Sequence, residues 1–148
     1  MKEGFTKIDS IKISSDFSSL VDVESLVDHT CSSLGIKEDA YGNVLIAVTE
    51  AVNNAIEHGN SFNSDLSVGV TVLDGSKDFC FSISDEGNGF DYDNLPDPTA
   101  PENLLKENGR GIFLMKSLSD KIEYEKDGKS VNIYFSKWLK YKRLILNL

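Results

Sequence analysis

The sequence predicts an α+β protein, a two-layer α/β sandwich in which helices cover one face of a mixed, mainly antiparallel sheet. Five short segments alternate apolar and polar residues with a period of two, and four of them pair off as hairpins. Two longer segments repeat apolar residues at the spacing of an amphipathic helix, and a third, shorter apolar segment also predicts a helix. The predicted order is strand, helix, helix, two strands, long loop, helix and two strands.

The composition predicts one domain and excludes some partners. The 148 residues have a formal net charge of -9 and are 40% hydrophobic, which predicts a single domain with a core of about 7–136 and a tail at 137–148. An acidic chain without a basic stripe argues against direct nucleic-acid binding and against an anionic membrane surface. With no membrane-length apolar run and no signal-peptide pattern, we expect a cytoplasmic protein. Cys31 and Cys80 are expected in the core, not in a disulfide or a zinc site.

The first part of the chain predicts one strand and two helices. Residues 7–13 alternate isoleucine with polar residues, as an edge strand does, and Ser14-Ser15-Asp16 can cap the next helix. Residues 17–34 repeat apolar side chains at helical spacing and end at Gly35, a residue typical of helix C-termini. The central helix, residues 37–59, has acidic side chains in its first turn.

The second part predicts two hairpins separated by a long loop and a helix. Residues 90–108 show no periodic pattern and contain all three prolines. A loop of this length inside a compact domain is usually functional or mobile. The predicted elements are strands 66–73 and 79–84, a helix over 112–118, and strands 121–126 and 130–135.

The central helix carries polar side chains along the edge of its apolar face. Glu50, Asn54 and His58 drift by only about 40° per step, so they form one row. Small side chains beside this row would let a bulky group approach it: Ala47, Ala51 and Ala55. Taken alone, the row favours a solvated helix face with a histidine charge at its end.

Two glycine motifs give this row a chemical context. In Asp85-x-Gly87-x-Gly89, at a strand end, the aspartate can accept a hydrogen bond from an exocyclic amine such as that of adenine, while the glycines allow close approach. Gly109-x-Gly111 precedes a helix, whose free amides can hold phosphate oxygens. Asn54 offers a neutral oxygen to Mg²⁺, and Glu50 can take a proton from a hydroxyl. Each motif alone is weak, because such glycines often mark turns. Their order and spacing make the set specific.

Together these motifs resemble the GHKL ATPase superfamily. The stretch Thr49–Asn60 is most similar to the bacterial anti-sigma-factor serine kinases, the RsbW-like group. The resemblance covers nearly the whole domain and implies the histidine-kinase-like (Bergerat) fold with ATP and Mg²⁺ as ligands. It implies that Glu50 is the general base and that Asn54 is the Mg²⁺ ligand. It also implies that Asp85 reads the adenine amine, helped through water by the Ser130 hydroxyl.

The same resemblance assigns the glycines and the long loop. The loop, residues 90–108, would be the ATP lid. Arg110 either contacts phosphate or is an exposed cation at a helix start, and His58 is expected to make a packing or lid contact. The absence of a P-loop motif agrees with the family, which binds phosphates without one. The glycines would shape the nucleotide pocket: Gly87, Gly89, Gly109 and Gly111.

The function that the resemblance implies is partner switching. Such a protein sequesters a sigma factor and phosphorylates a serine of an anti-anti-sigma (STAS-type) protein, and it works as a homodimer. Glu50 supports this hypothesis, since a pure binding protein needs no base there. An ATP-gated binding module without kinase activity is an alternative. A stand-alone histidine-kinase-type ATPase domain is another, but the sequence shows no phosphoacceptor helix pair.

Overall fold

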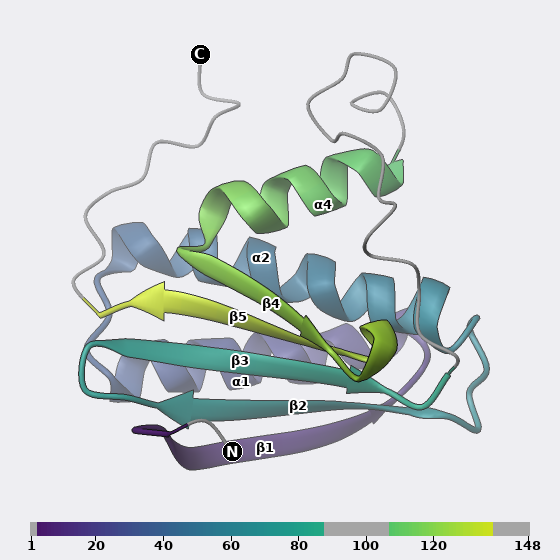
Figure 1. The fold of residues 1–148 in the computed structure, drawn as a ribbon, viewed down its shortest axis with the longest axis horizontal. Helices are drawn as coiled ribbons and strands as arrows, with labels where there is room; N and C mark the ends of the chain where they lie inside the picture. Colours follow the sequence, from purple (N-terminus) through teal and green to yellow (C-terminus); the bar gives the residue numbers. More distant parts are fainter. Residues whose placement is uncertain (1–2, 88–106, 138–148) are drawn as a thin grey trace.

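A computed structural model describes residues 3–87 and 107–137 of the chain. They form one five-stranded sheet in the order β1-β2-β3-β5-β4, with the helices on one face (Figure 1). This confirms the predicted two-layer α+β class. The strands are β1 (Thr6–Ser14), β2 (Ser67–Asp74), β3 (Asp78–Asp85), β4 (Lys121–Glu125) and β5 (Ser130–Ser136).

The sheet is antiparallel at every described pairing, so the expected mixed character was wrong. Strands β2 and β3 are antiparallel because they form a hairpin, as are β4 and β5, and β1 also runs antiparallel to β2. Strands β3 and β4 run in the same direction, but β5 lies between them and pairs with both. The insertion of β5 therefore removes the one parallel ladder that the helical crossover would otherwise create.

The described helices match the predicted ones but differ at their ends. They are η1 (Phe17–Ser19), α1 (Leu20–Ser33), α2 (Glu38–Asn54), the π turn η2 (Ala55–Gly59) and α4 (Glu107–Leu118). A short 3₁₀ turn, η4 (Lys126–Gly128), also lies between β4 and β5, where a hairpin connection was predicted. The Asp16 carboxylate accepts the Ser18 N–H at 2.9 Å, as the predicted cap does, but the first turn is a 3₁₀ helix. Gly35 has a φ of +68°, which suits a residue that ends a helix. Within these described helices, none has the length and apolar character needed to cross a membrane.

The core lies between the helices and the sheet. The strand register aligns apolar rows across the sheet, one being Val70, Ile83 and Val131, and another Val72, Phe81 and Ile133. The apolar face of α2 covers the buried core with fully buried valines: Val44, Val48 and Val52. Burial of each such side chain contributes about 1.5–3 kcal/mol. This packing fixes the distance between the polar edge of α2 and the strands.

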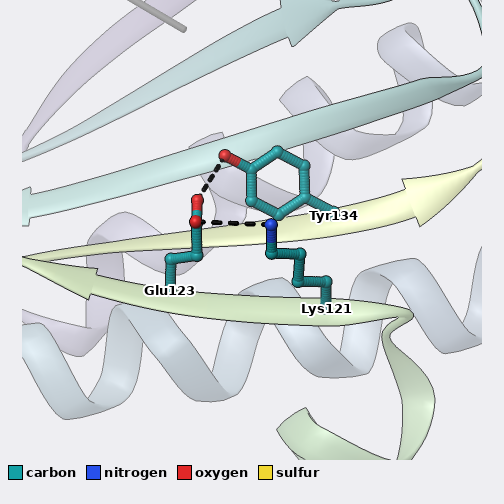
Figure 2. Close-up of polar contacts among 3 residues, drawn as sticks. All are labelled: Lys121, Glu123 and Tyr134. Atoms are coloured by element: carbon teal, nitrogen blue, oxygen red, sulfur yellow. Dashed lines mark hydrogen bonds and ion pairs between the residues drawn. The ribbon is translucent and has the colours of Figure 1, made fainter.

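The two edge strands are β1, as predicted, and β4. Figure 2 shows that β4 carries charges on the face opposite to the helices: Lys121 Nζ lies 3.4 Å from Glu123 Oε2, and Tyr134 donates from Oη to Glu123 Oε1 at 2.7 Å. Charged side chains on a short edge strand discourage pairing with another chain. This surface therefore protects the sheet edge.

Cys31 and Cys80 are both buried, as predicted. Burial raises the pKa of Cys31 to about 11. A thiol with such a pKa stays protonated at neutral pH, so it has little nucleophilic character.

Candidate functional site

A small pocket opens where α2 faces the end of β3. Asn54 and Asp85 both line it, and so do the small side chains of Ala51 and Ala55. Two of the three alanines beside the polar row thus leave space next to Asn54. The structure brings together an amide from α2 and a carboxylate from β3 that are 31 residues apart in the sequence.

Helix α4 packs along α2 (Figure 1). This packing brings Gly111 against Glu50. A Cβ at Gly111 would stand only 2.5 Å from Glu50 Oε2, so the glycine makes room for this carboxylate. Along the axis of α2, Glu50 and Asn54 are one turn apart, or about 6 Å. The structure therefore places a carboxylate, an amide and the first turns of a helix next to one another.

The end of α2 also meets Asp85 directly. At Gly59, the last residue of the π turn, a Cβ would overlap the Asp85 carboxylate, with Oδ1 at 2.9 Å. At Gly87, a Cβ would overlap the Gly59 carbonyl and stand 3.2 Å from the Asn60 nitrogen. These two glycines therefore allow the Asp-x-Gly turn to lie against the helix end.

The Asp85 carboxylate is partly buried, and burial raises its pKa above the ordinary value. Two contacts oppose this shift. The Gly87 N–H donates to Asp85 Oδ1 at 2.9 Å, and the positive charge of Lys129 lies nearby. Burial is the largest cause, so the free site carries a carboxylate whose negative charge lacks full solvation. Such a group favours a ligand that donates a hydrogen bond to it.

The second glycine motif lies inside α4 and not before it. The helix begins at Glu107, so Gly109, Arg110 and Gly111 occupy its first and second turns. Only the first N–H groups of a helix lack an intrahelical acceptor. Gly111 is in the second turn, so its N–H is not among the free amides of the helix start, and this glycine serves the close approach to Glu50.

His58 does not continue the polar row into the pocket. It lies in the π turn, is exposed, and its Nε2 is 3.9 Å from the Glu57 carboxylate. The π turn closes with a bond from the Asn60 N–H to the Ala55 carbonyl at 2.8 Å, five residues back, which changes the angular spacing. The regular i, i+4 row thus holds for Glu50 and Asn54 alone.

Ser130 is buried, but its placement does not support the expected contact with a base. It pairs with Ser84, one residue before Asp85, and neighbouring residues of a strand point to opposite faces. The pocket is lined instead by Lys129 and Val131, on either side of Ser130. The Ser130 hydroxyl, which the resemblance implied as a contact to the base through water, thus lies on the strand face opposite to the one that lines the pocket.

Other predicted positions fall outside the described residues. These are Gly89 and most of the lid at 90–108, while Arg110 lies in α4 with an undescribed side chain. The structure adds pocket residues that the sequence reasoning did not single out: Met115, Tyr124, Gly128 and Lys129. Burial raises the pKa of Tyr124 to about 12, so this phenol is neutral at pH 7. No local motif marks these residues, because they reach the pocket through the register of β4 and β5 and the packing of α4.

Comparison with known proteins agrees with this arrangement. A model of the histidine kinase-like ATPase domain matches residues 13–135, so the chain belongs to this family. It is similar to the serine-protein kinase RsbW of Staphylococcus aureus strain JH9, with 32% identity over 120 residues, 76% of this chain and 75% of the relative. It is also similar to RsbW of Staphylococcus epidermidis, with 31% identity over 128 residues and the same coverage. Within the family, the chain is thus a member of the RsbW-like group.

A solved structure shows the same fold. A crystal structure of the RsbU and RsbW domains of a Mycobacterium tuberculosis protein matches with a TM-score of 0.58 and 13% identity. The match covers 87% of this chain and 32% of the other. At this identity the likeness concerns the fold alone.

Proposed function

We propose that this protein is a protein-serine kinase that binds ATP with Mg²⁺. In this function it sequesters a sigma factor and phosphorylates a serine of an anti-anti-sigma (STAS-type) antagonist. The observation that carries the proposal is the meeting of Asn54 and Asp85 in one pocket, with Glu50 one turn away against Gly111. The printed names of the relatives, serine-protein kinase, support the reaction class.

One residue of the site recognises the base, and others take part in phosphoryl transfer. The partly buried Asp85 carboxylate accepts a hydrogen bond from the adenine amine, which also compensates its incomplete solvation. Glu50 takes the proton of the attacking serine hydroxyl. The serine oxygen then bonds to the γ-phosphorus while the bond to the bridging oxygen of ADP breaks. The proton stays on Glu50 and the phosphoryl group moves to the serine.

Asn54 fits a cation that is shared with a nucleotide. Among residues 3–87 and 107–137, no three histidine, cysteine or acidic side chains cluster as a metal site of their own. Mg²⁺ is commonly held by one or two protein oxygens together with phosphate oxygens and water, and the Asn54 amide supplies such an oxygen in the pocket. When bound there, Mg²⁺ would neutralise charge on the phosphates.

The partner assignment rests on the RsbW-like group and on charge. The net charge of -9 suits a basic region of a sigma factor, since complementary charge speeds association and helps to select partners. A homodimer is the assembly that we propose with it. An ATP-gated binding module that transfers no phosphoryl group is the competing function, because both would use the same nucleotide pocket.

The test is a mass-resolved phosphotransfer assay with ATP, Mg²⁺ and a candidate antagonist encoded beside this gene. Wild type is compared with Glu50→Gln and Asp85→Asn. Glu57→Gln is the matched control, because Glu57 lies in the π turn close to His58 and outside the pocket. We expect transfer to one serine, a loss of at least about 100-fold in Glu50→Gln, and nearly unchanged transfer in Glu57→Gln.

ATP affinity measured on the same variants separates the two functions. For a kinase, Glu50→Gln keeps ATP binding and loses transfer, while Asp85→Asn loses both. If ATP binding depends on Asp85 but wild type transfers nothing to any candidate serine, the binding module is the correct function. If neither variant changes ATP binding or transfer, the site assignment is wrong.

A further inference from the structure

Asn60 follows the π turn and is almost completely buried, with 2% of its surface exposed. Its side-chain nitrogen Nδ2 donates to Ser15 Oγ at 2.7 Å and to the Ser67 carbonyl at 3.0 Å. Its Oδ1 accepts the Glu86 N–H at 2.9 Å. One amide therefore joins the end of α2 to the chain after β1, the start of β2 and the turn after β3.

The turn held by Asn60 is the one that carries Asp85. The Asp85 N–H donates to the carbonyl of Lys129, the residue just before β5, at 2.9 Å, which ties the start of the turn to the chain that enters β5. At the other end, Gly87 rests against the Gly59 carbonyl. Among the side chains of the described residues, Asn60 supplies the bond from the helix end to the middle of this turn. The position of the Asp85 carboxylate relative to α2 thus depends on it.

The backbone around Asn60 shows that this orientation is imposed. The next two residues, Ser61 and Phe62, have φ values of +51° and +58°, a conformation that residues other than glycine rarely adopt. The Phe62 N–H bonds back to the Ile56 carbonyl at 2.9 Å, which closes the helix end. The chain therefore accepts local strain where it turns the Asn60 side chain into the interior.

An amide is the side chain that suits this place. It donates two hydrogen bonds and accepts one at the same position, and all three are made here. A carboxylate would lack the donors and would bring a charge into a buried site. Alanine would leave the Ser67 carbonyl and the Glu86 N–H without this partner.

We propose that Asn60 is a positioning residue for nucleotide recognition, which sets the Asp85 carboxylate in register with the Glu50–Asn54 row of α2. The inference rests on the proposed function, because it takes Asp85 as the contact to the adenine amine. Asn60 itself does not line the pocket and acts through the turn. Its effect is therefore on base discrimination, in addition to any effect on stability.

The test compares ATP with purine riboside triphosphate, which lacks the 6-amino group. Binding is measured by calorimetry for wild type, Asn60→Ala and Asn63→Ala, at a temperature at which circular dichroism shows each protein to be folded. Asn63 is the matched control, since it is exposed in the turn just after Asn60 and its Oδ1 accepts a local hydrogen bond from the Asp65 N–H at 3.0 Å. We expect wild type and Asn63→Ala to prefer ATP, and this preference to fall by about tenfold in Asn60→Ala.

A residue with a purely structural role would weaken both nucleotides equally and leave their ratio unchanged. An unchanged ratio in Asn60→Ala, with wild type preferring ATP, would overturn the inference about Asn60 alone. Equal affinity of wild type for the two nucleotides would overturn the role of Asp85 in the proposed function, and the inference with it. If Asn60→Ala does not fold, Asn60→Ser keeps a polar group in the buried position but cannot span all three partners, and the same loss of preference is expected.

Discussion

The glycines of this site matter mainly because they have no side chain, which lets neighbouring groups come close. Gly59 lies against the Asp85 carboxylate, Gly87 against the Gly59 carbonyl, and Gly111 against Glu50. None of these three has a positive φ. Their role is therefore close approach between elements and not an unusual backbone conformation.

The variant Gly111→Ala tests whether Glu50, the proposed general base, needs the space that Gly111 leaves. The added methyl group would meet Glu50 Oε2 at 2.5 Å, and the flexible carboxylate can move away. Because alanine also favours a helix by about 0.5–1 kcal/mol over glycine, we expect little change in the free energy of unfolding. We expect phosphotransfer to fall by about 10- to 100-fold, since displacement of a catalytic group by about 1 Å has effects of this size. Single-turnover kinetics and urea unfolding measure the two quantities.

Gly42→Ala is the matched control for this variant. Gly42 lies in α2, and a Cβ there would meet open space. It should therefore stabilise the protein by about 0.5–1 kcal/mol and leave phosphotransfer unchanged. If Gly111→Ala transfers phosphate as fast as Gly42→Ala does, the contact between Gly111 and Glu50 has no part in the reaction.

The raised pKa of Asp85 predicts that the free energy of unfolding depends on pH. Burial raises its pKa in the folded state above the value of 3.8, so the neutral form is favoured by folding. Well below pH 3.8 the group is neutral in both states, and the stability linked to it is lost as the pH rises through the folded-state pKa. Asparagine is neutral throughout. In urea unfolding without nucleotide, the advantage of Asp85→Asn over wild type should therefore be small near pH 4 and larger at pH 7.

The opposite trend would contradict the burial of this carboxylate. If Asp85→Asn were less stable than wild type at pH 7 and equal to it at pH 4, contacts to the charged form would outweigh its desolvation. The Gly87 N–H and Lys129 would then be the dominant influences on the Asp85 pKa.

At the scale of elements, the π turn at the end of α2 decides how the helix meets the strands. A regular α-helix through residues 55–59 would place the following backbone differently, because its hydrogen bonds span four residues and not five. The wider turn brings Gly59 onto Asp85 and directs Asn60 into the interior. Such turns are frequent at functional sites, and this one joins both parts of the proposed nucleotide site.

The outer face of β4 and β5 gives a prediction that is independent of the pocket. Tyr134→Phe removes the 2.7 Å hydrogen bond to Glu123 that Figure 2 shows. We expect the free energy of unfolding to fall by about 0.5–1.5 kcal/mol in urea denaturation. ATP affinity should not change, because Tyr134 lies on the face opposite to its neighbours Ile133 and Phe135, which pack in the core.

Glu123→Gln is the companion variant for this hydrogen bond. It keeps an acceptor oxygen for Tyr134 and weakens the largely exposed pair with Lys121. An exposed pair of this kind contributes about 0–1 kcal/mol, so the loss should be the smaller of the two. A larger loss in Glu123→Gln would show that the ion pair, and not the tyrosine bond, stabilises this edge.

At the scale of the whole molecule, nucleotide binding should stabilise the fold, because the pocket contains residues from both layers of the sandwich. With ATP at about 100 times its Kd, the linkage relation gives about 2.7 kcal/mol, which corresponds to a rise in Tm of about 5–10 °C for a chain of this size. Differential scanning fluorimetry with and without ATP and Mg²⁺ measures it. At the same ATP concentration, Asp85→Asn should shift far less. An equal shift in Asp85→Asn would place the nucleotide elsewhere.

Much of the fold could be predicted from the sequence, because its signals are local. The period of two in residues 66–73 and 79–84 identified the β2-β3 hairpin, and helical spacing identified α1 and α2. The edge position of β1 and the burial of both cysteines were also confirmed. Each of these depends on side chains a few residues apart, so the sequence alone determined them.

The arrangement of the site was decided by tertiary structure. The amide of Asn54 and the carboxylate of Asp85 share a pocket because valines of α2 pack onto β3 and its neighbours. The sheet order, with β5 inserted beside β3, brings Lys129 and not the Ser130 side chain to that pocket. The bonds of Asn60 join segments 7 to 45 residues away. No local pattern specifies such contacts, because they arise only when distant elements pack and the chain satisfies its buried polar groups.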